Sequence, residues 1–299
     1  MIDTKYTYAV ARIRALETAL FTSATLDQLM ACQTEEQCLQ LIQEKGWGGA
    51  DTPVNAEAIL TREQEKIWEN IKDLGVDMSV FDVLSYPNMF HNLKAAIKDV
   101  CTEENGRAMN IYYDDTAISP DEMLEIVRSK DFSRLPQYMA GAAKEAYETL
   151  LHTRDGQLCD VIVDKAALEA IYAAGREAKD SIIKDYAEST VAIADIKIAV
   201  RSQKTAKNMD FMKRAMVECE SLSVAQLSKA AVSGIDAIVE YLSGTAYAEG
   251  GKAIAESMSA FERWCDNRMM ETMQSQKYQS FSVGPLVAYV LARENEIKT

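Results

Sequence analysis

The chain has 299 residues, of which 48% are hydrophobic and 26% charged, and its formal net charge at pH 7 is -14. This composition is typical of a globular protein with a packed core, and it excludes a disordered or fibrous chain. No basic cluster offsets the acidic balance, which disfavours binding to nucleic-acid phosphates. No apolar stretch reaches the roughly 18 residues that a membrane span needs. Charged residues also interrupt the apolar residues at the N-terminus, so we expect no signal segment and a cytoplasmic protein.

The cysteines do not predict a disulfide framework. Six of them are scattered without a CxxC pair, at positions 32, 38, 101, 159, 219 and 265. In a large chain without a signal segment, such cysteines are expected to be reduced. We therefore predict mostly buried thiols that act as small apolar residues.

Helical spacing of apolar residues begins at the N-terminus. Residues at steps of three and four predict a first helix with one apolar face, formed by Tyr6, Val10, Ile13, Leu16 and Leu20. Thr25-Leu-Asp-Gln28 and Thr34-Glu-Glu-Gln37 are capping boxes, which predict two short helices that meet at a corner. The second of these helices is expected to stop at Gly46. Residues 62–73 then predict a solvated amphipathic helix, with apolar residues on one face and charges on the other.

The middle of the chain predicts further helices. Ser119 as N-cap, followed by Pro120 and Glu122, is a strong helix start. The apolar residues 161–163 are the best strand candidate, but we favour a helix start there. Residues 164–208 predict one long helix that only Gly175 interrupts. Its expected apolar face consists of Ile182, Tyr186, Ile193, Ile196 and Val200.

The last third repeats the layout of the first. Ser223-Val-Ala-Gln226 and Ser233-Gly-Ile-Asp236 predict two capped short helices, with a stop at Gly244. Another single helix is predicted from Lys252 onward, with its apolar face along Ile254, Met258, Phe261, Cys265 and Met269. Period-two alternation is nowhere convincing. The predicted fold class is therefore all-α.

An internal repeat organises these helices. Asn92-Leu-Lys94, Asp195-Ile-Lys197 and Glu296-Ile-Lys298 each follow an apolar helical stretch, at spacings of 103 and 101 residues. This period is too long for tetratricopeptide or ankyrin arrays, which repeat at about 33 to 34 residues. We predict three similar helical bundles, at 1–106, 107–207 and 208–299, with boundaries near Gly106 and Lys207.

The sequence offers few residues for chemistry. The only histidines, His91 and His152, fit neither an HExxH nor an ExxH pattern, and we expect both at the core edge or surface. Gly46-Trp-Gly-Gly49 lacks the lysine of a nucleotide-binding loop and is expected to be a helix stop and turn. The Asp114-Asp115 pair completes no DDxxD motif and favours a loop before a helix.

A short methionine strip does not change this conclusion. Met269, Met270 and Met273 could form an adaptable partner surface, but we favour core filling. We accordingly assign no catalytic, cofactor-binding or metal-binding residues, and no cofactor. The predicted protein is not an enzyme.

Three segments together resemble a known family. Tyr8-Ala-Val-Ala-Arg-Ile-Arg-Ala-Leu-Glu17, the three tripeptides and the final stretch from Gly284 to Lys298 are similar to the C subunits of prokaryotic V-type (A-type) ATPases. The eukaryotic counterpart is called the d subunit. The resemblance covers essentially the whole chain, and its most specific parts are ARIRALE near the start and AYVLARENEIK near the end.

The resemblance implies a fold and a role. It implies three helical bundles around a pseudo-threefold axis, which form a funnel. It also implies a non-catalytic central-stalk component, at the inner face of the cell membrane, that links axle subunits D and F to the proteolipid rotor ring. Such a component would transmit torque between ATP hydrolysis or synthesis and proton or sodium transport.

The chain departs from this family in one respect, and two alternatives stay open. Family members usually continue past the final Asn-Glu-Ile-Lys with a further apolar segment, whereas this chain stops at Thr299, so we expect a shortened third bundle. One alternative is a helical magnesium-dependent enzyme with a deep pocket lined by several carboxylates. The other is a helical scaffold unconnected to ATPases.

Overall fold

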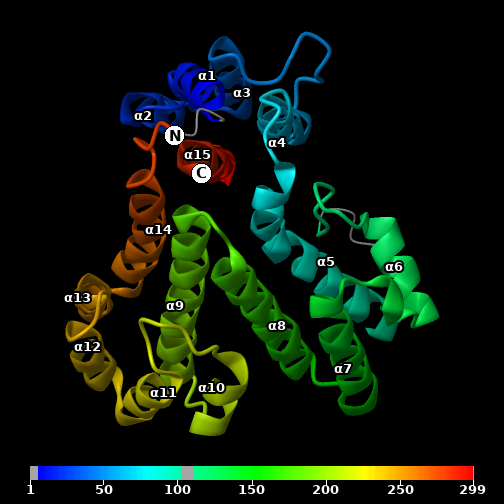
Figure 1. Ribbon diagram of the computed structural model, residues 1–299, viewed down its shortest axis with the longest axis vertical. Helices are drawn as coiled ribbons and strands as arrows, with labels where there is room; N and C mark the ends of the chain where they lie inside the picture. The colour runs from blue at the N-terminus through cyan, green and yellow to red at the C-terminus, as the bar shows by residue number, and fades with distance from the viewer. Residues whose placement is uncertain (1–5, 103–110, 299) are drawn as a thin grey trace. The chain divides into compact units, whose positions relative to one another are not determined.

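The computed structural model describes residues 6–102 and 111–298. Within these residues the secondary structure consists of α-helices and two short 3₁₀ helices, without a strand (Figure 1). The prediction of an all-α fold is therefore confirmed. The chain forms two compact units, one from residues 1–79 together with 270–299 and the other from residues 80–269.

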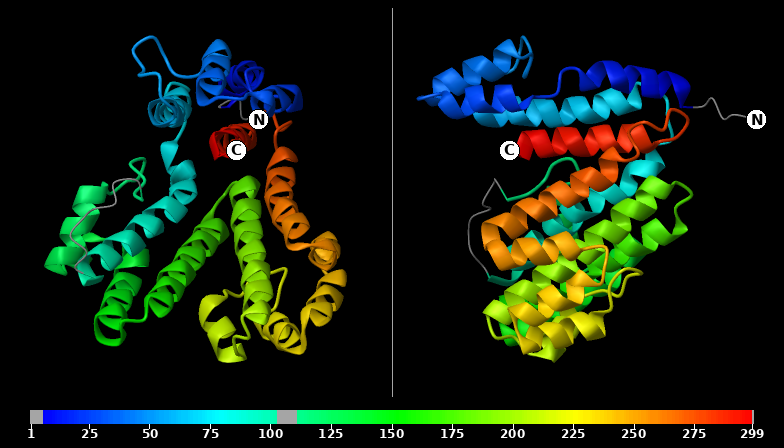
Figure 2. Two further views of the ribbon diagram at one scale, coloured as in Figure 1. Left: turned by 180° about the vertical axis from the view of Figure 1, so that it is seen from behind. Right: turned by 90° about the vertical axis from the view of Figure 1, so that its left-hand side faces the viewer.

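The first unit joins the two ends of the chain. Its helices are α1 (Thr7–Glu17), α2 (Ser23–Ala31), α3 (Glu35–Glu44), α4 (Ala56–Lys72) and α15 (Gly284–Lys298). The last helix, α15, packs against both α1 and α4, and the three run side by side in Figure 2 (right). Residues 284–290 of α15 are all buried, so its apolar first turns fix this helix within the unit.

The predicted face of the first helix is mostly correct. Tyr6, Val10 and Ile13 are buried, and Leu16 is half-buried. Leu20 is also half-buried but lies beyond α1, which ends at Glu17. The apolar spacing therefore continues past the end of the helix.

The second unit contains the remaining helices. In chain order these are the 3₁₀ helix η1 (Met78–Phe81) at its edge, α5 (Asp82–Thr102), α6 (Pro120–Ser129), η2 (Phe132–Arg134), α7 (Gln137–Thr153), α8 (Gly156–Glu177), α9 (Ser181–Lys204), α10 (Met209–Ala215), α11 (Val224–Ser233), α12 (Ile235–Ser243), α13 (Ala248–Glu256) and α14 (Met258–Gln274), the last as far as Met269. One apolar cluster of buried residues joins α5, α6, α7 and α8. Another joins α9 to the helices from α10 to α14.

Helix caps test the predicted starts directly. Thr34, Ser119 and Ser223 are N-caps, and each side chain accepts a backbone N–H three residues later. The prediction for Thr25 is wrong, because Thr22 caps α2 and accepts the N–H of Thr25 itself. The predicted cap at Ser233 is also wrong. Gly234 starts α12 at a φ of +132°, a conformation that glycine adopts without steric cost.

The long helix predicted over 164–208 is wrong. The chain forms an antiparallel pair, α8 and α9, with a break at residues 178–180, and the strand candidate at 161–163 lies inside α8 (Figure 2, left). The predicted apolar face of α9 is buried throughout, so its period was correct. Gly175 is where the two helices approach, because a Cβ built there would lie 2.2 Å from the Cβ of Ala187.

The single helix predicted from Lys252 is also two helices. Ser257 is extended, at a φ of -170° and a ψ of 163°, and separates α13 from α14. Its hydroxyl accepts the N–H of Ala260 at 3.0 Å, so it acts as a cap for α14. The apolar period continues across this break, which explains the error.

The predicted division into three bundles stays a prediction. The boundary near Gly106 lies outside the described residues, and the boundary near Lys207 falls between α9 and α10. The compact units group residues by contact, whereas the predicted bundles follow internal similarity.

Gly175 provides a test of the α8–α9 packing. We predict that Gly175→Ala lowers the free energy of unfolding by about 1–3 kcal/mol, because the added methyl overlaps Ala187. Gly141, inside α7, is a matched control, since a Cβ there would meet no atom within 4 Å. Gly141→Ala is expected to stabilise the protein by about 0.5–1 kcal/mol through helix propensity. Urea unfolding measures both; similar effects of the two variants would contradict the close approach.

Candidate functional site

The residues that the sequence singled out do not converge. His91 is half-buried on α5, with Nε2 2.7 Å from the carbonyl oxygen of Ile111, and His152 is exposed near the end of α7. Asp114 and Asp115 lie in the loop before α6, as predicted. In the part of the chain that the structure describes, no three His, Cys, Asp or Glu side chains are placed to hold a metal ion. Nor does any described helix have the length and apolarity to cross a membrane.

The methionine strip and the cysteines are partly as predicted. Met273 is fully buried, and Met269 packs against the cluster around α9, so core filling is confirmed for both. Met270 is half-buried. Three cysteines are buried and three half-buried, the latter being Cys32, Cys38 and Cys219.

The first residue of each tripeptide of the repeat accepts a backbone N–H from a segment between two helices. Asn92 on α5 is completely buried, although its side chain is polar. Its Oδ1 accepts the backbone N–H of Tyr113 at 2.9 Å, and its Nδ2 donates to the carbonyl of Tyr113 at 2.8 Å. Asn92 therefore binds both backbone groups of one residue in the segment that leads to α6. We use the word strap for a segment that leads to the N-cap of a helix and is held by such a side chain.

Asp195 on α9 also holds a backbone N–H. It too is completely buried, and its Oδ1 accepts the backbone N–H of Val217 at 3.2 Å. Val217 lies in the strap that leads to α11, six residues before the N-cap Ser223. Tyr113 stands at the same distance before the N-cap Ser119.

Glu296 on α15, in the first unit, is the third side chain that holds a strap. One carboxylate oxygen accepts the backbone N–H of Phe21, which directly precedes the N-cap Thr22 of α2. The strap for the last tripeptide therefore comes from the beginning of the chain. The sequence predicted the repeat from the tripeptides, but it could not show that their first residues hold backbone amides.

Two of the tripeptide lysines also have equivalent partners. Lys94 Nζ lies 2.7 Å from Asp164 on α8, and Lys197 Nζ lies 3.0 Å from Glu262 on α14. A second cation one turn later pairs with the same facing helix in each case, Lys98 with Asp160 and Arg201 with Glu262. These pairs are partly exposed, so each contributes little stability, and they mainly fix the register of the two helices.

Asp195 differs from Asn92 in carrying an ionisable group. Burial raises the pKa of its carboxyl to about 8, and the nearby Glu218 adds to the shift, whereas the Val217 N–H and Lys165 oppose it. Its Oδ2 is buried without a hydrogen-bond partner. The neutral, protonated acid is therefore the favoured form at neutral pH, and it is the closest chemical equivalent of the amide at Asn92.

A second buried network stabilises the first unit. Glu63 on α4 is 4% exposed and Arg293 on α15 is 9% exposed, and their charged atoms lie 2.5 Å apart. Glu63 also accepts the N–H of Gly48 at 2.8 Å and pairs with Lys66 at 2.6 Å. Arg293 makes a second ion pair with Glu296. Two carboxylates and two cations therefore satisfy one another, which makes their burial tolerable.

Aromatic rings cover this network. The guanidinium of Arg293 lies 5.1 Å from the ring centroid of Trp47, and that ring stacks on Phe21 at 4.7 Å. Phe21 is the residue whose N–H Glu296 accepts. The network and the last strap are therefore one continuous site. The prediction that residues 62–73 carry only solvated charges was wrong for Glu63, whose partner Arg293 is distant in sequence.

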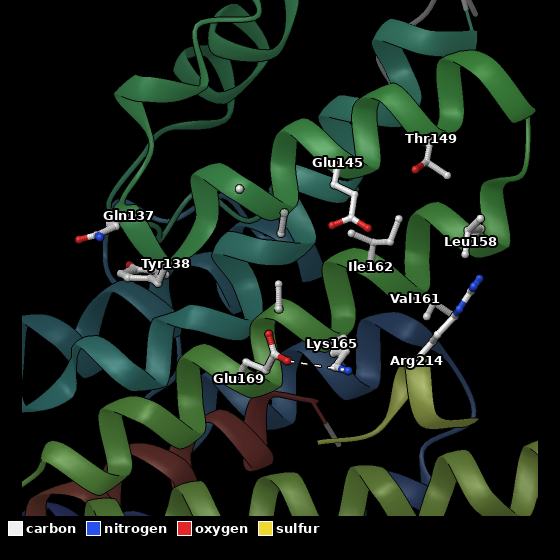
Figure 3. Close-up of a pocket in the computed structure, with 13 residues that line it drawn as sticks. Gln137, Tyr138, Glu145, Thr149, Leu158, Val161, Ile162, Lys165, Glu169 and Arg214 are labelled. Atoms are coloured by element: carbon white, nitrogen blue, oxygen red, sulfur yellow. Dashed lines mark ion pairs between the residues drawn. The ribbon is translucent and has the colours of Figure 1, made fainter. Parts of the chain in front are cut away.

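The second unit has a groove between α7 and α8 (Figure 3). Its volume is about 620 Å³, and Leu158, Val161 and Ile162 give it an apolar wall. Glu145 and Glu169 face it from different helices. Lys165, 3.9 Å from Glu169, and Arg214 add positive charge. This mixed set of charges is not the carboxylate cluster that the magnesium-dependent enzyme requires.

Comparison with known proteins identifies relatives over nearly the whole chain. The sequence model of the family described as "ATP synthase (C/AC39) subunit" matches residues 9–299. The C subunit of the V-type sodium ATPase of Enterococcus hirae is 20% identical over 295 residues, which cover 96% of this chain and 89% of that protein. The C subunit of the A-type ATP synthase of Methanocaldococcus jannaschii is 21% identical over 329 residues, covering 98% of this chain and 80% of that protein.

The raised pKa of Asp195 predicts a pH-dependent stability. An unfolded aspartate titrates near pH 4, so between pH 4 and about 8 the folded chain holds a proton that the unfolded chain releases. Stability contributed by this group therefore falls as pH rises through that window. Asp195→Asn removes the titration. We expect the variant to match the parent at pH 4 and to gain on it by up to about 4 kcal/mol at pH 7.

Urea unfolding at several pH values measures this difference. The reverse exchange, Asn92→Asp, is the matched comparison. An ionised carboxylate cannot donate to the Tyr113 carbonyl, so this variant is expected to lose about 2–4 kcal/mol at neutral pH. Parallel pH profiles for Asp195→Asn and the parent protein would contradict the assignment of a buried neutral acid.

The Glu63–Arg293 network predicts a large effect for one substitution. Arg293→Met leaves Glu63 and Glu296 buried without their shared cation, and should cost about 3–5 kcal/mol. Amide hydrogen exchange in α15 should accelerate together with the loss of stability. Arg62→Met is the control, because Arg62 pairs with Glu65 and Glu69 on the exposed side of the same helix α4. Equal effects of the two substitutions would show that the buried network is not stabilising.

Proposed function

The chain belongs to the family of ATP synthase (C/AC39) subunits, and on this basis we propose that it is a non-catalytic central-stalk subunit of a rotary V/A-type ATPase. In this role it binds the axle subunits D and F and the proteolipid ring. It thereby transmits torque between ATP hydrolysis or synthesis and proton or sodium transport. Its place is peripheral, at the inner face of the cell membrane.

The extent of the family match carries the proposal. The match runs from α1 to the last residue, so it involves the complete helical framework and not one bundle within a different protein. The two relatives, C subunits of a sodium ATPase and of an ATP synthase, are also covered over most of their length. The same role therefore accounts for both compact units.

The packing of the chain supports a mechanical role. Close-packed interiors have low compressibility and transmit strain. Here the straps, which connect helices, are fixed to long helices by hydrogen bonds to Asn92, Asp195 and Glu296. A rotor component that passes on torque must resist such local deformation.

We further propose that the chain consists of three similar helical bundles in a pseudo-threefold arrangement. The equivalent roles of Asn92, Asp195 and Glu296 support this proposal. In it, the bundle of Glu296 takes its strap from the residues around Phe21. The residues around Phe21 then belong to the bundle of Glu296, so the bundle boundaries differ from the ranges 1–106, 107–207 and 208–299.

The two alternatives have less support. A magnesium-dependent enzyme would use several converging carboxylates, whereas the groove between α7 and α8 combines two carboxylates with Lys165 and Arg214. A scaffold unconnected to ATPases would share the fold. It differs from the proposal only in its partners, so binding decides between them.

Reconstitution of the coupled complex tests the proposal. The complete ATPase is produced with and without this chain, and both membranes are assayed for ATP-driven ion uptake. Without the chain we expect ion uptake to be lost while the detached head and axle continue to hydrolyse ATP. Purified chain added back should restore uptake and co-purify with the D and F subunits and the ring in a fixed ratio.

Two variants make this experiment specific. Chain carrying Arg62→Met should restore uptake like the parent, whereas Arg293→Met should restore less because its first unit is loosened. Full ion uptake in the absence of the chain would overturn the proposal. A chain that folds normally but binds neither the axle nor the ring would favour the unconnected scaffold.

A further inference from the structure

Two cysteines meet at the corner between α2 and α3. Cys32 is the C-cap of α2, with an extended backbone, and Cys38 lies in the first turns of α3. Both side chains are half-buried, so reagents in solution can reach them. Neither residue takes part in the straps or in the network around Glu63.

The geometry places the two sulfur atoms against the same turn of α2. Cys32 Sγ donates to the carbonyl oxygen of Gln28 at 3.4 Å, and Cys38 Sγ donates to that of Leu29 at 3.9 Å. These carbonyls belong to successive residues in the last turn of α2. Burial and the neighbouring Cys38 thiol raise the pKa of Cys32. A disulfide at this corner would join two thiols that already bind neighbouring carbonyls of one helical turn.

The other cysteines lack this combination of proximity and access. Cys101, Cys159 and Cys265 are buried. Cys219 is half-buried, but its sulfur lies against Ser221 and the Leu222 carbonyl rather than another thiol. The pair at the α2–α3 corner is therefore the most favourable place for thiol chemistry among the described residues.

We propose that Cys32 and Cys38 form a reversible dithiol–disulfide site, with a small disulfide of the glutathione type as oxidant. One cysteine thiolate attacks a sulfur of the oxidant, forms a mixed disulfide and expels one glutathione thiolate. The second cysteine thiolate attacks the protein sulfur of that mixed disulfide and expels the other. The protons of the two cysteines end on the two glutathione molecules, and the protein loses two electrons.

The closed disulfide would act on the corner itself. It replaces two weak S–H hydrogen bonds with a covalent link between the end of α2 and the start of α3. Because the folded corner already holds the sulfurs together, the disulfide should form more readily in the folded chain than in the unfolded one. By linkage, the disulfide should raise the folding equilibrium constant by the same factor by which folding favours its formation.

Redox titration of the full chain tests the site. The native protein is equilibrated in buffers of graded glutathione disulfide to glutathione ratio, then acid-quenched, alkylated and digested with trypsin. Both cysteines fall in one tryptic peptide, residues 15–45, because no Lys or Arg lies between Arg14 and Lys45. The expected product is this peptide with two hydrogens fewer and no alkyl group. Glutathione disulfide also leaves the exposed Met30 unoxidised, so the mass change is unambiguous.

Matched variants and an unfolded reference complete the test. Cys38→Ser should give only a glutathione adduct at Cys32, and Cys219→Ser should behave like the parent. The same titration in concentrated urea should need a ratio at least tenfold more oxidising. Alkylated or glutathione-modified peptide as the main native product, or an equal equilibrium in urea, would overturn the proposal.

Discussion

A buried backbone amide must find an acceptor, and this requirement governs how the chain is assembled. The N–H groups of Tyr113, Val217 and Phe21 are satisfied by side chains of Asn92, Asp195 and Glu296 on long helices. Without its acceptor the buried Val217 N–H would be an unpaired donor, at a cost of about 1–3 kcal/mol. The polar residue at the head of each tripeptide is therefore a structural requirement inside an apolar helix face.

The last of these acceptors explains why the two ends of the chain lie in one compact unit. Glu296 near the C-terminus holds Phe21 near the N-terminus, and Arg293 joins Glu296 to Glu63 on α4. Ionic contacts of this kind discriminate strongly against wrong partners, because removing one member leaves a buried charge. The first unit is consequently specified by contacts between residues that are more than two hundred positions apart.

Local signals in the sequence predicted local structure well and distant contacts poorly. The helix class and the caps at Thr34, Ser119 and Ser223 were predicted correctly, since each depends on residues a few positions apart. The breaks at residues 178–180 and at Ser257 were missed because the apolar period continues across them. The prediction of a solvated charged face missed Glu63, although its spacing of four residues from both Ile59 and Ile67 places it on the buried face of α4. The fold class and family were thus accessible, but the buried polar contacts were not.

The strap amides themselves offer the most direct measurement. Residue-resolved hydrogen exchange would report on Phe21, Tyr113 and Val217, which lie outside helices. We expect all three to exchange as slowly as amides inside neighbouring helices, and Asn92→Ala to release Tyr113 while Val217 stays protected. Exchange of these amides at the rate of exposed turn residues would contradict the central claim that side chains on the long helices fix the straps.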